Sequence, residues 1–125
     1  MLPYEEMSQL IMVRVLITLE PRMYREAIAS ALRRSRPDSE VMLAAEVSLN
    51  GQVHDFAPHV IVRSDSGPEV PEGQLGSVVC RVEVLYTDHM GVRVSVAGGR
   101  SYTIEDASME DLISLVDEAE GLISG

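Results

Sequence analysis

The chain has no lysine, no tryptophan, one phenylalanine and one cysteine among its 125 residues. Without lysine it can form no Schiff base with a carbonyl substrate, and only arginine is left to pair with a phosphate. Because aromatic residues are few, a core must consist of aliphatic side chains. The single cysteine, Cys80, can form no internal disulfide, which is typical of a protein in a reducing cytoplasm.

Long apolar runs and an excess of basic residues are also missing. No uninterrupted apolar run approaches the roughly 18 residues of a membrane span, and Glu5 and Glu6 stand where an export signal would be basic. Twenty acidic and ten basic residues give a formal net charge of -10, which repels phosphate backbones and anionic lipids. We therefore predict a cytoplasmic protein that binds neither nucleic acid nor membranes.

The motifs of common enzymes are absent as well. The sequence has no Ser-His-Asp order, no phosphate-binding glycine loop and no pair of catalytic carboxylates in a supporting context. His54 and His59, with Asp55 between them, lack a clear third ligand for a metal. We therefore predict no catalysis, no cofactor and no metal.

The length fits one domain of ordinary size. Residues 1–11 match no clear element, and Met12 directly precedes the first strong strand pattern. We therefore predict an N-terminal appendage over residues 1–11 and a single domain over residues 12–125.

Strands and helices alternate in the first half of this domain. The apolar, β-branched run that follows Met12 is typical of a strand buried on both faces, and apolar residues recur at helical spacing after Pro21. The order favours parallel pairing with right-handed crossovers. The expected elements are a strand over 12–18, a helix from Pro21 to near Ser35, a strand over 40–45, a short helix over 49–56 despite its Asn50-Gly51 turn signal, and a strand over 58–62.

The pattern changes in the second half. Prolines and glycines over residues 65–77 predict an irregular loop. Beyond it apolar residues alternate, with Cys80 on the same side as Val78 and Val82 and therefore in the core. Ser108 and Asp111 have the spacing of a helix N-terminal cap. The expected elements are an antiparallel meander of strands over 78–86, 92–96 and 101–104, and a final helix over 108–119.

Three stretches resemble the receiver domain of bacterial response regulators. They are VRVLITLEPRMYREAIASALRRSRPDSEVMLAAE, APHVIVRSDSG and AGGRSYTIEDASMEDLISLVDEAEGLI. The first is similar to the family's opening strand, acidic pair, first helix and second strand, the next to its third strand, and the last to its final strand and helix. The resemblance implies an α/β, flavodoxin-like receiver-type sandwich with a parallel βαβαβ half. An antiparallel hairpin or meander would replace the third and fourth helices, and a C-terminal helix would close the domain.

The positions that hold Mg²⁺ and accept phosphate in the family differ here. The acidic pair has become Leu19 and Glu20, so one magnesium ligand is lost. The acceptor aspartate falls on Ser64. Asp65 follows one residue later and would point to the other side of an alternating strand.

The remaining phosphoryl-binding positions differ too. The lysine that pairs with the phosphoryl group is replaced by Glu105, which would repel it. The switch hydroxyl would be Thr87, or Tyr86 in a shifted alignment. These departures predict a pseudo-receiver that is not phosphorylated and acts as a protein–protein interaction module in signalling or regulation.

Two alternatives remain at this point. The same residues could form a sensor for a small ligand or cation at the strand ends, near Glu20 and Asp65. The chain could also be an atypical receiver that is phosphorylated on Asp65.

Charge is distributed unevenly, with arginines concentrated in the first helix and acids in the last. In the receiver fold these helices lie side by side, so their charges could pair within the chain. They could instead form a polar docking face for a homodimer or a basic partner protein. The residues of this possible interaction face are Arg22, Arg25, Arg33, Asp111, Asp117 and Glu118.

Overall fold

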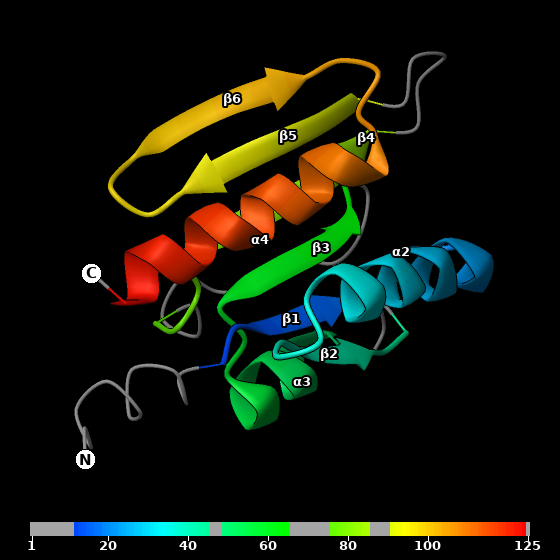
Figure 1. Ribbon diagram of the computed structural model, residues 1–125, viewed down its shortest axis with the longest axis horizontal. Helices are drawn as coiled ribbons and strands as arrows, with labels where there is room; N and C mark the ends of the chain where they lie inside the picture. The colour runs from blue at the N-terminus through cyan, green and yellow to red at the C-terminus, as the bar shows by residue number, and fades with distance from the viewer. Residues whose placement is uncertain (1–11, 46–48, 66–75, 86–90, 125) are drawn as a thin grey trace.

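Six strands form one mixed sheet among the residues that the structure, a computed structural model, describes: 12–45, 49–65, 76–85 and 91–124. Helices lie on both faces of this sheet (Figure 1). No helix in these ranges is long and apolar enough to cross a membrane. The elements are β1 (Arg14–Ile17), α2 (Arg22–Ser35), β2 (Glu40–Leu43), α3 (Leu49–Phe56), β3 (Val60–Ser64), β4 (Cys80–Leu85), β5 (Gly91–Val96), β6 (Arg100–Ile104) and α4 (Met109–Ser124).

The strands follow the order β2-β1-β3-β4-β5-β6. β1 pairs in parallel with β2 and β3, and β3 pairs in parallel with β4, whereas β5 and β6 continue the sheet antiparallel. The parallel first half and the antiparallel C-terminal meander are therefore both confirmed. Because β5 reverses the chain direction and β6 reverses it again, all strands except β5 end at one edge of the sheet, which we call the carboxyl edge.

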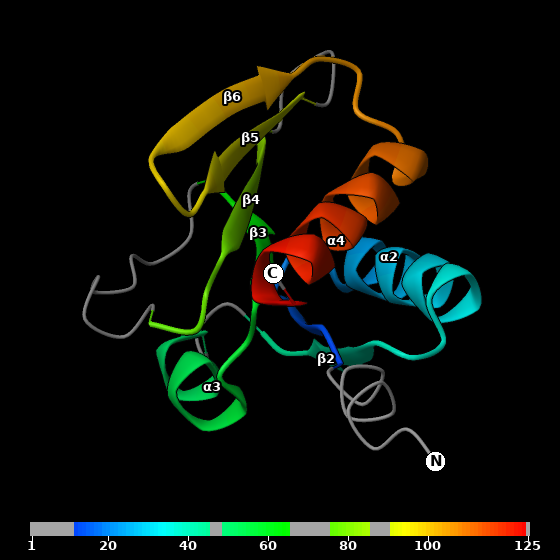
Figure 2. The same cartoon turned by 60° about the vertical axis from the view of Figure 1, so that its left-hand side comes forward.

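The main core lies between one face of the sheet and the helices α2 and α4, which lie side by side (Figure 2). Every second strand residue points into it, as the two-residue period of a strand requires. Its buried members are Val13, Val15, Ile17 and Leu19 around β1, Ile28, Ala29 and Leu32 of α2, Val60 and Val62 of β3, Cys80, Val82 and Val84 of β4, Val92, Val94 and Val96 of β5, and Leu112, Leu115, Val116 and Ala119 of α4.

A smaller cluster lies on the opposite face, under α3. Val53 packs there against Leu16 and Ile61. The Asn50-Gly51 signal does not interrupt this helix, because burial of Val53 offsets the roughly 1 kcal/mol that a glycine costs inside a helix. Since α2 and α3 cover opposite faces, the doubly wound first half is also confirmed.

α2 begins and ends where the sequence predicts, whereas α4 begins there but continues to Ser124, beyond the expected end at residue 119. α2 starts directly after Pro21, and the backbone N–H of Arg36 donates to the Leu32 carbonyl at its end. At the start of α4, Asp111 Oδ2 accepts from the Ser108 N–H at 2.8 Å, and Ser108 Oγ accepts from the Asp111 N–H at 3.3 Å. This reciprocal pair is the predicted cap.

Ion pairs connect α4 to its neighbours. Arg36, at the end of α2, forms ion pairs with Asp117 and Glu120 of α4. Arg100 of β6 forms an ion pair with Glu118. Since the acidic partners are partly exposed, each pair contributes about 0–1 kcal/mol, and the apolar core provides most of the stability of this layer.

One detail of the predicted alternation is wrong. β4 begins at Cys80, two residues later than expected, and Val78 contacts the smaller cluster under α3 instead of the main core. Cys80 itself is buried in the main core as predicted, and burial raises the pKa of its thiol to about 11. The thiol is therefore protonated at neutral pH and unreactive.

Thr18 provides a test of the buried sheet. It has no exposed surface, and within the described part of the chain its hydroxyl Oγ1 forms no hydrogen bond. We expect Thr18→Val, which keeps the side-chain shape, to raise the free energy of unfolding by about 1 kcal/mol because it removes an unsatisfied buried group. Urea denaturation measures this. Val15→Thr, the matched control, should lower the free energy of unfolding. A Thr18→Val variant less stable than the wild type would contradict the claim that the Thr18 hydroxyl is buried without a hydrogen bond.

His59 connects the beginnings of β1 and β3. Its ring Nδ1 accepts a hydrogen bond from the backbone N–H of Arg14 at 2.9 Å, and the backbone N–H of His59 donates to the Arg14 carbonyl at 2.8 Å. A nitrogen that accepts is unprotonated. Burial, and then the charge of Arg14, lower the pKa of His59 below its usual value, with Glu40 acting in the opposite direction.

This lowered pKa predicts a loss of stability in mild acid. Above the ordinary histidine pKa of about 6.5, the ring is neutral in both the folded and the unfolded chain. Below it the unfolded chain binds the proton more readily, so the free energy of unfolding falls with the pH. His59→Asn can accept the same hydrogen bond without titrating, and its urea midpoint should fall less between about pH 7 and pH 5. Equal falls in both proteins would show that His59 is not responsible.

Candidate functional site

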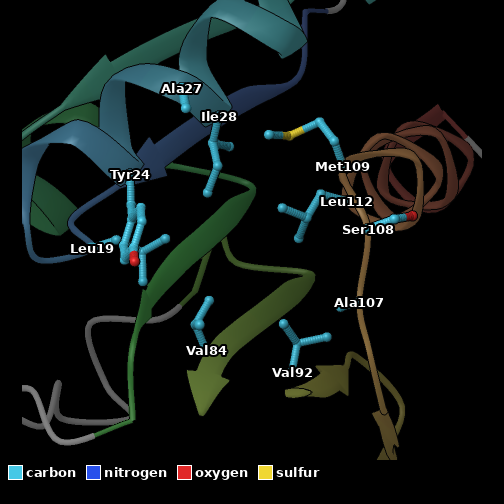
Figure 3. A pocket seen from close by; sticks show the side chains of 10 residues that line it. All are labelled: Leu19, Tyr24, Ala27, Ile28, Val84, Val92, Ala107, Ser108, Met109 and Leu112. Carbon is cyan, nitrogen blue, oxygen red and sulfur yellow. The ribbon is translucent and has the colours of Figure 1, made fainter. Parts of the chain in front are cut away.

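A cavity of about 150 Å³ lies at the carboxyl edge, between the N-terminal halves of α2 and α4. Figure 3 shows the side chains that line it, which come from both helices, from the end of β1, from β4 and β5, and from the connection before α4. Its innermost part consists of the buried side chains of Leu19, Ile28, Val84, Val92 and Leu112. The cavity is therefore continuous with the main core.

More exposed residues surround its opening. Tyr24 is 38% exposed, Ala27 and Ser108 are exposed, and Ala107 and Met109 are half-buried. The small side chains Ala27 and Ala107 leave space between the helices here, whereas Arg36 joins the helices at their other ends. The cavity thus lies at the opposite end of the helix pair from the ion pairs of Arg36.

The lining is almost entirely apolar. Apart from the hydroxyls of Tyr24 and Ser108, the described side chains that line the cavity carry no nitrogen or oxygen atom. The Ser108 Oγ already lies 3.1 Å from Asp111 Oδ2. A charged ligand would lose its hydration without gaining a partner, so this arrangement favours an uncharged one.

Leu19 and Glu20, which the resemblance aligns with the acidic pair of receiver domains, have separate surroundings. Leu19 is 2% exposed and belongs to both the core and the cavity wall. The Glu20 side chain is exposed and lies 3.0 Å from a guanidinium nitrogen of Arg25, which also donates to the Leu19 carbonyl at 3.0 Å. The one remaining carboxylate is therefore neutralised by an arginine of the first turn of α2.

Ser64 and Asp65 end the third strand differently. Ser64 is the last residue of β3 and is 2% exposed. Asp65 follows in a turn with an exposed side chain, and its backbone N–H donates to the Val84 carbonyl at 3.2 Å. The structure thus places a buried hydroxyl at the strand end and the carboxylate beyond it.

Glu105 lies away from these residues. It follows β6 and is exposed. β4 and β5 separate β6 from β3 in the sheet, and three strand spacings correspond to about 14 Å. Because β5 lies between β4 and β6, Glu105 is one strand spacing further from β3 than it would be if β6 paired directly with β4. Thr87 lies outside the described residues.

The charged residues of the predicted interaction face all have partners inside the chain, but not one another. Arg22 pairs with Glu26 at 3.0 Å, and Arg33 donates to the Val41 carbonyl at 3.4 Å. Arg25 binds Glu20, Asp111 caps α4, and Asp117 and Glu118 pair with Arg36 and Arg100. Arg36 and Arg100 could not be identified as partners from the sequence, because each ion pair joins two separate elements of the fold.

A metal centre finds no support in the described part of the chain, where no three His, Cys, Asp or Glu side chains come together. His59, one of the residues considered for such a site, uses its Nδ1 for the hydrogen bond from Arg14.

The cavity was not predicted from the sequence. Its signals were an apolar residue, Leu19, in an acidic position and alanines at positions 27 and 107, but a void between two helices depends on how the helices are placed. No protein-family model matches the chain, and no curated protein matches it. The chain is thus an α/β protein with a mixed sheet. Its function has to be inferred from the residues at the carboxyl edge.

Proposed function

We propose that the chain is a receiver-like module that is not phosphorylated and acts through protein contact in signalling or regulation. The arrangement agrees with a flavodoxin-like receiver type in its first half: parallel β2-β1-β3-β4 pairing, first and last helices on one face, second helix on the other. It departs from that type by the antiparallel β5 and β6.

The observation that carries the proposal is the burial of Leu19. At a position where receivers use a carboxylate to hold Mg²⁺, a leucine with 2% exposure forms part of the core. The neighbouring Glu20 already pairs with Arg25. Phosphoryl transfer needs a cation to offset the charge of the phosphate, and the part of the chain that the structure describes contains no group of three His, Cys, Asp or Glu side chains to hold one.

The remaining positions support the same conclusion. Ser64 provides a buried hydroxyl in place of the acceptor carboxylate, and a hydroxyl does not form the acyl phosphate of receivers. Glu105 stands in place of the lysine of receivers and carries the opposite charge, and β6 is about three strand spacings, or about 14 Å, from β3, so this position supplies no cation beside Ser64. Among the described residues that follow β3, the exposed Asp65 is the candidate acceptor.

The edge strand β6 supports contact with a second copy of the chain. In the described residues β6 pairs only with β5, so its outer backbone groups are open to another strand. Tyr102 and Ile104 point toward the core and are only partly buried. In an antiparallel pair with its two-fold axis at Thr103, each Tyr102 lies opposite Ile104 of the other copy, and both become more buried. We therefore assign self-association to β6.

Native mass spectrometry with and without acetyl phosphate and Mg²⁺ tests both parts of the proposal. We expect a dimer whose mass and assembly are unchanged by the phosphodonor. Thr103→Lys places two like charges opposite each other at the axis and should give a monomer. Ser114→Lys, on the exposed surface of α4, is the matched control and should remain dimeric.

Two results would contradict the proposal. A phosphoryl adduct that Asp65→Asn removes would identify an atypical receiver. A wild-type protein that stays monomeric at every concentration would refute self-association through β6.

The apolar cavity favours a second candidate, a sensor of a small ligand. A cation-binding version of this sensor is less favoured, since Glu20 is paired with Arg25 and the described residues contain no group of three His, Cys, Asp or Glu side chains that could hold a cation.

A further inference from the structure

We infer that the cavity between α2 and α4 is a binding site for a small, uncharged, mainly apolar molecule, the size of one aromatic ring or one branched alkyl group. The inference rests on the cavity alone, and it holds whether or not the chain self-associates through β6.

The volume sets the size of the ligand. At about 150 Å³ the cavity matches the volume at which an apolar cavity in another protein binds benzene. A fused ring system or a nucleotide is too large for it. A single water molecule would find few partners among the buried side chains of Leu19, Val92 and Leu112.

The surroundings set the charge of the ligand. The lining contains no Asp, Glu, Arg or His side chain, so an ion would be desolvated without compensation. The acids nearest to the start of α4, Glu110 and Asp111, add negative charge near the opening and disfavour an anion. Arg25 is already bound to Glu20 and the Leu19 carbonyl. A neutral ring or alkyl group neither loses the hydration of a charge nor is repelled by these acids.

The opening sets where a polar substituent can lie. Ser108 and Tyr24 are exposed there, whereas the innermost residues are buried and apolar. A ligand with one hydroxyl group would therefore place its ring against Leu19 and Leu112 and leave the hydroxyl at the water-facing end, as amphipathic groups do at such boundaries.

Methyl NMR titration of the full chain provides the test. Toluene, phenol and cyclohexanol are the neutral probes, and benzoate and benzylamine are the charged controls of similar size. We expect saturable shifts of the methyl signals of Ile28, Met109 and Leu112 with the neutral probes, with Kd values of roughly 0.1–1 mM. The charged analogues should bind at least about tenfold more weakly, because their desolvation is not compensated.

Two variants locate the site. Ala27→Leu fills the cavity from α2 and should reduce the affinity for the neutral probes at least about tenfold. Ser30→Leu makes a similar addition on an exposed position of the same helix and should leave the affinity unchanged. Ala107→Leu fills the cavity from the other side, which keeps the test valid if Ala27→Leu disturbs the fold.

Each contrary result overturns the inference. Absence of a saturable shift with any neutral probe would show that the cavity is closed or too small. Equal affinity for benzoate or benzylamine would refute the neutral ligand class. Shifts that persist in both cavity-filling variants would place the binding elsewhere.

Discussion

The structure depends on one apolar layer, the burial of alternate strand side chains beneath α2 and α4. Val15, Ile17, Val82 and Val94 are almost completely buried in it. Complete burial of one such side chain stabilises a fold by about 1.5–3 kcal/mol, well above what each exposed ion pair between α4 and its neighbours contributes. The ion pairs of Arg36 and Arg100 therefore orient α4, whereas the layer holds it on the sheet.

The same layer determines what the carboxyl edge can do. Leu19 continues the series Val13, Val15 and Ile17 by one more alternation, so its side chain has to enter the core. A carboxylate at this position would be desolvated beneath α2. The apolar side chain at position 19 and the apolar cavity beside it are thus two consequences of the same alternation, and the proposed function rests on both.

Much of the fold was predictable because its signals are local. Alternation around Cys80 and Val82, helical spacing after Pro21 and the Ser108 and Asp111 cap each depend on a few neighbouring residues. Interactions between distant segments were not predictable in this way. The partners of Arg36 lie in α4, and the position of Glu105 depends on the strand order, which places β5 between β4 and β6. The beginning of β4 at Cys80 instead of Val78 reflects contact with the cluster under α3, which the alternation alone does not reveal.

The free energy of unfolding of Leu19→Asp, measured in urea with and without Mg²⁺, tests the central claim most directly. If position 19 belongs to the core, the variant loses at least about 3 kcal/mol, and Mg²⁺ does not restore the loss. A variant that is as stable as the wild type, or that Mg²⁺ stabilises, would show that this edge is still a metal site and would contradict the account.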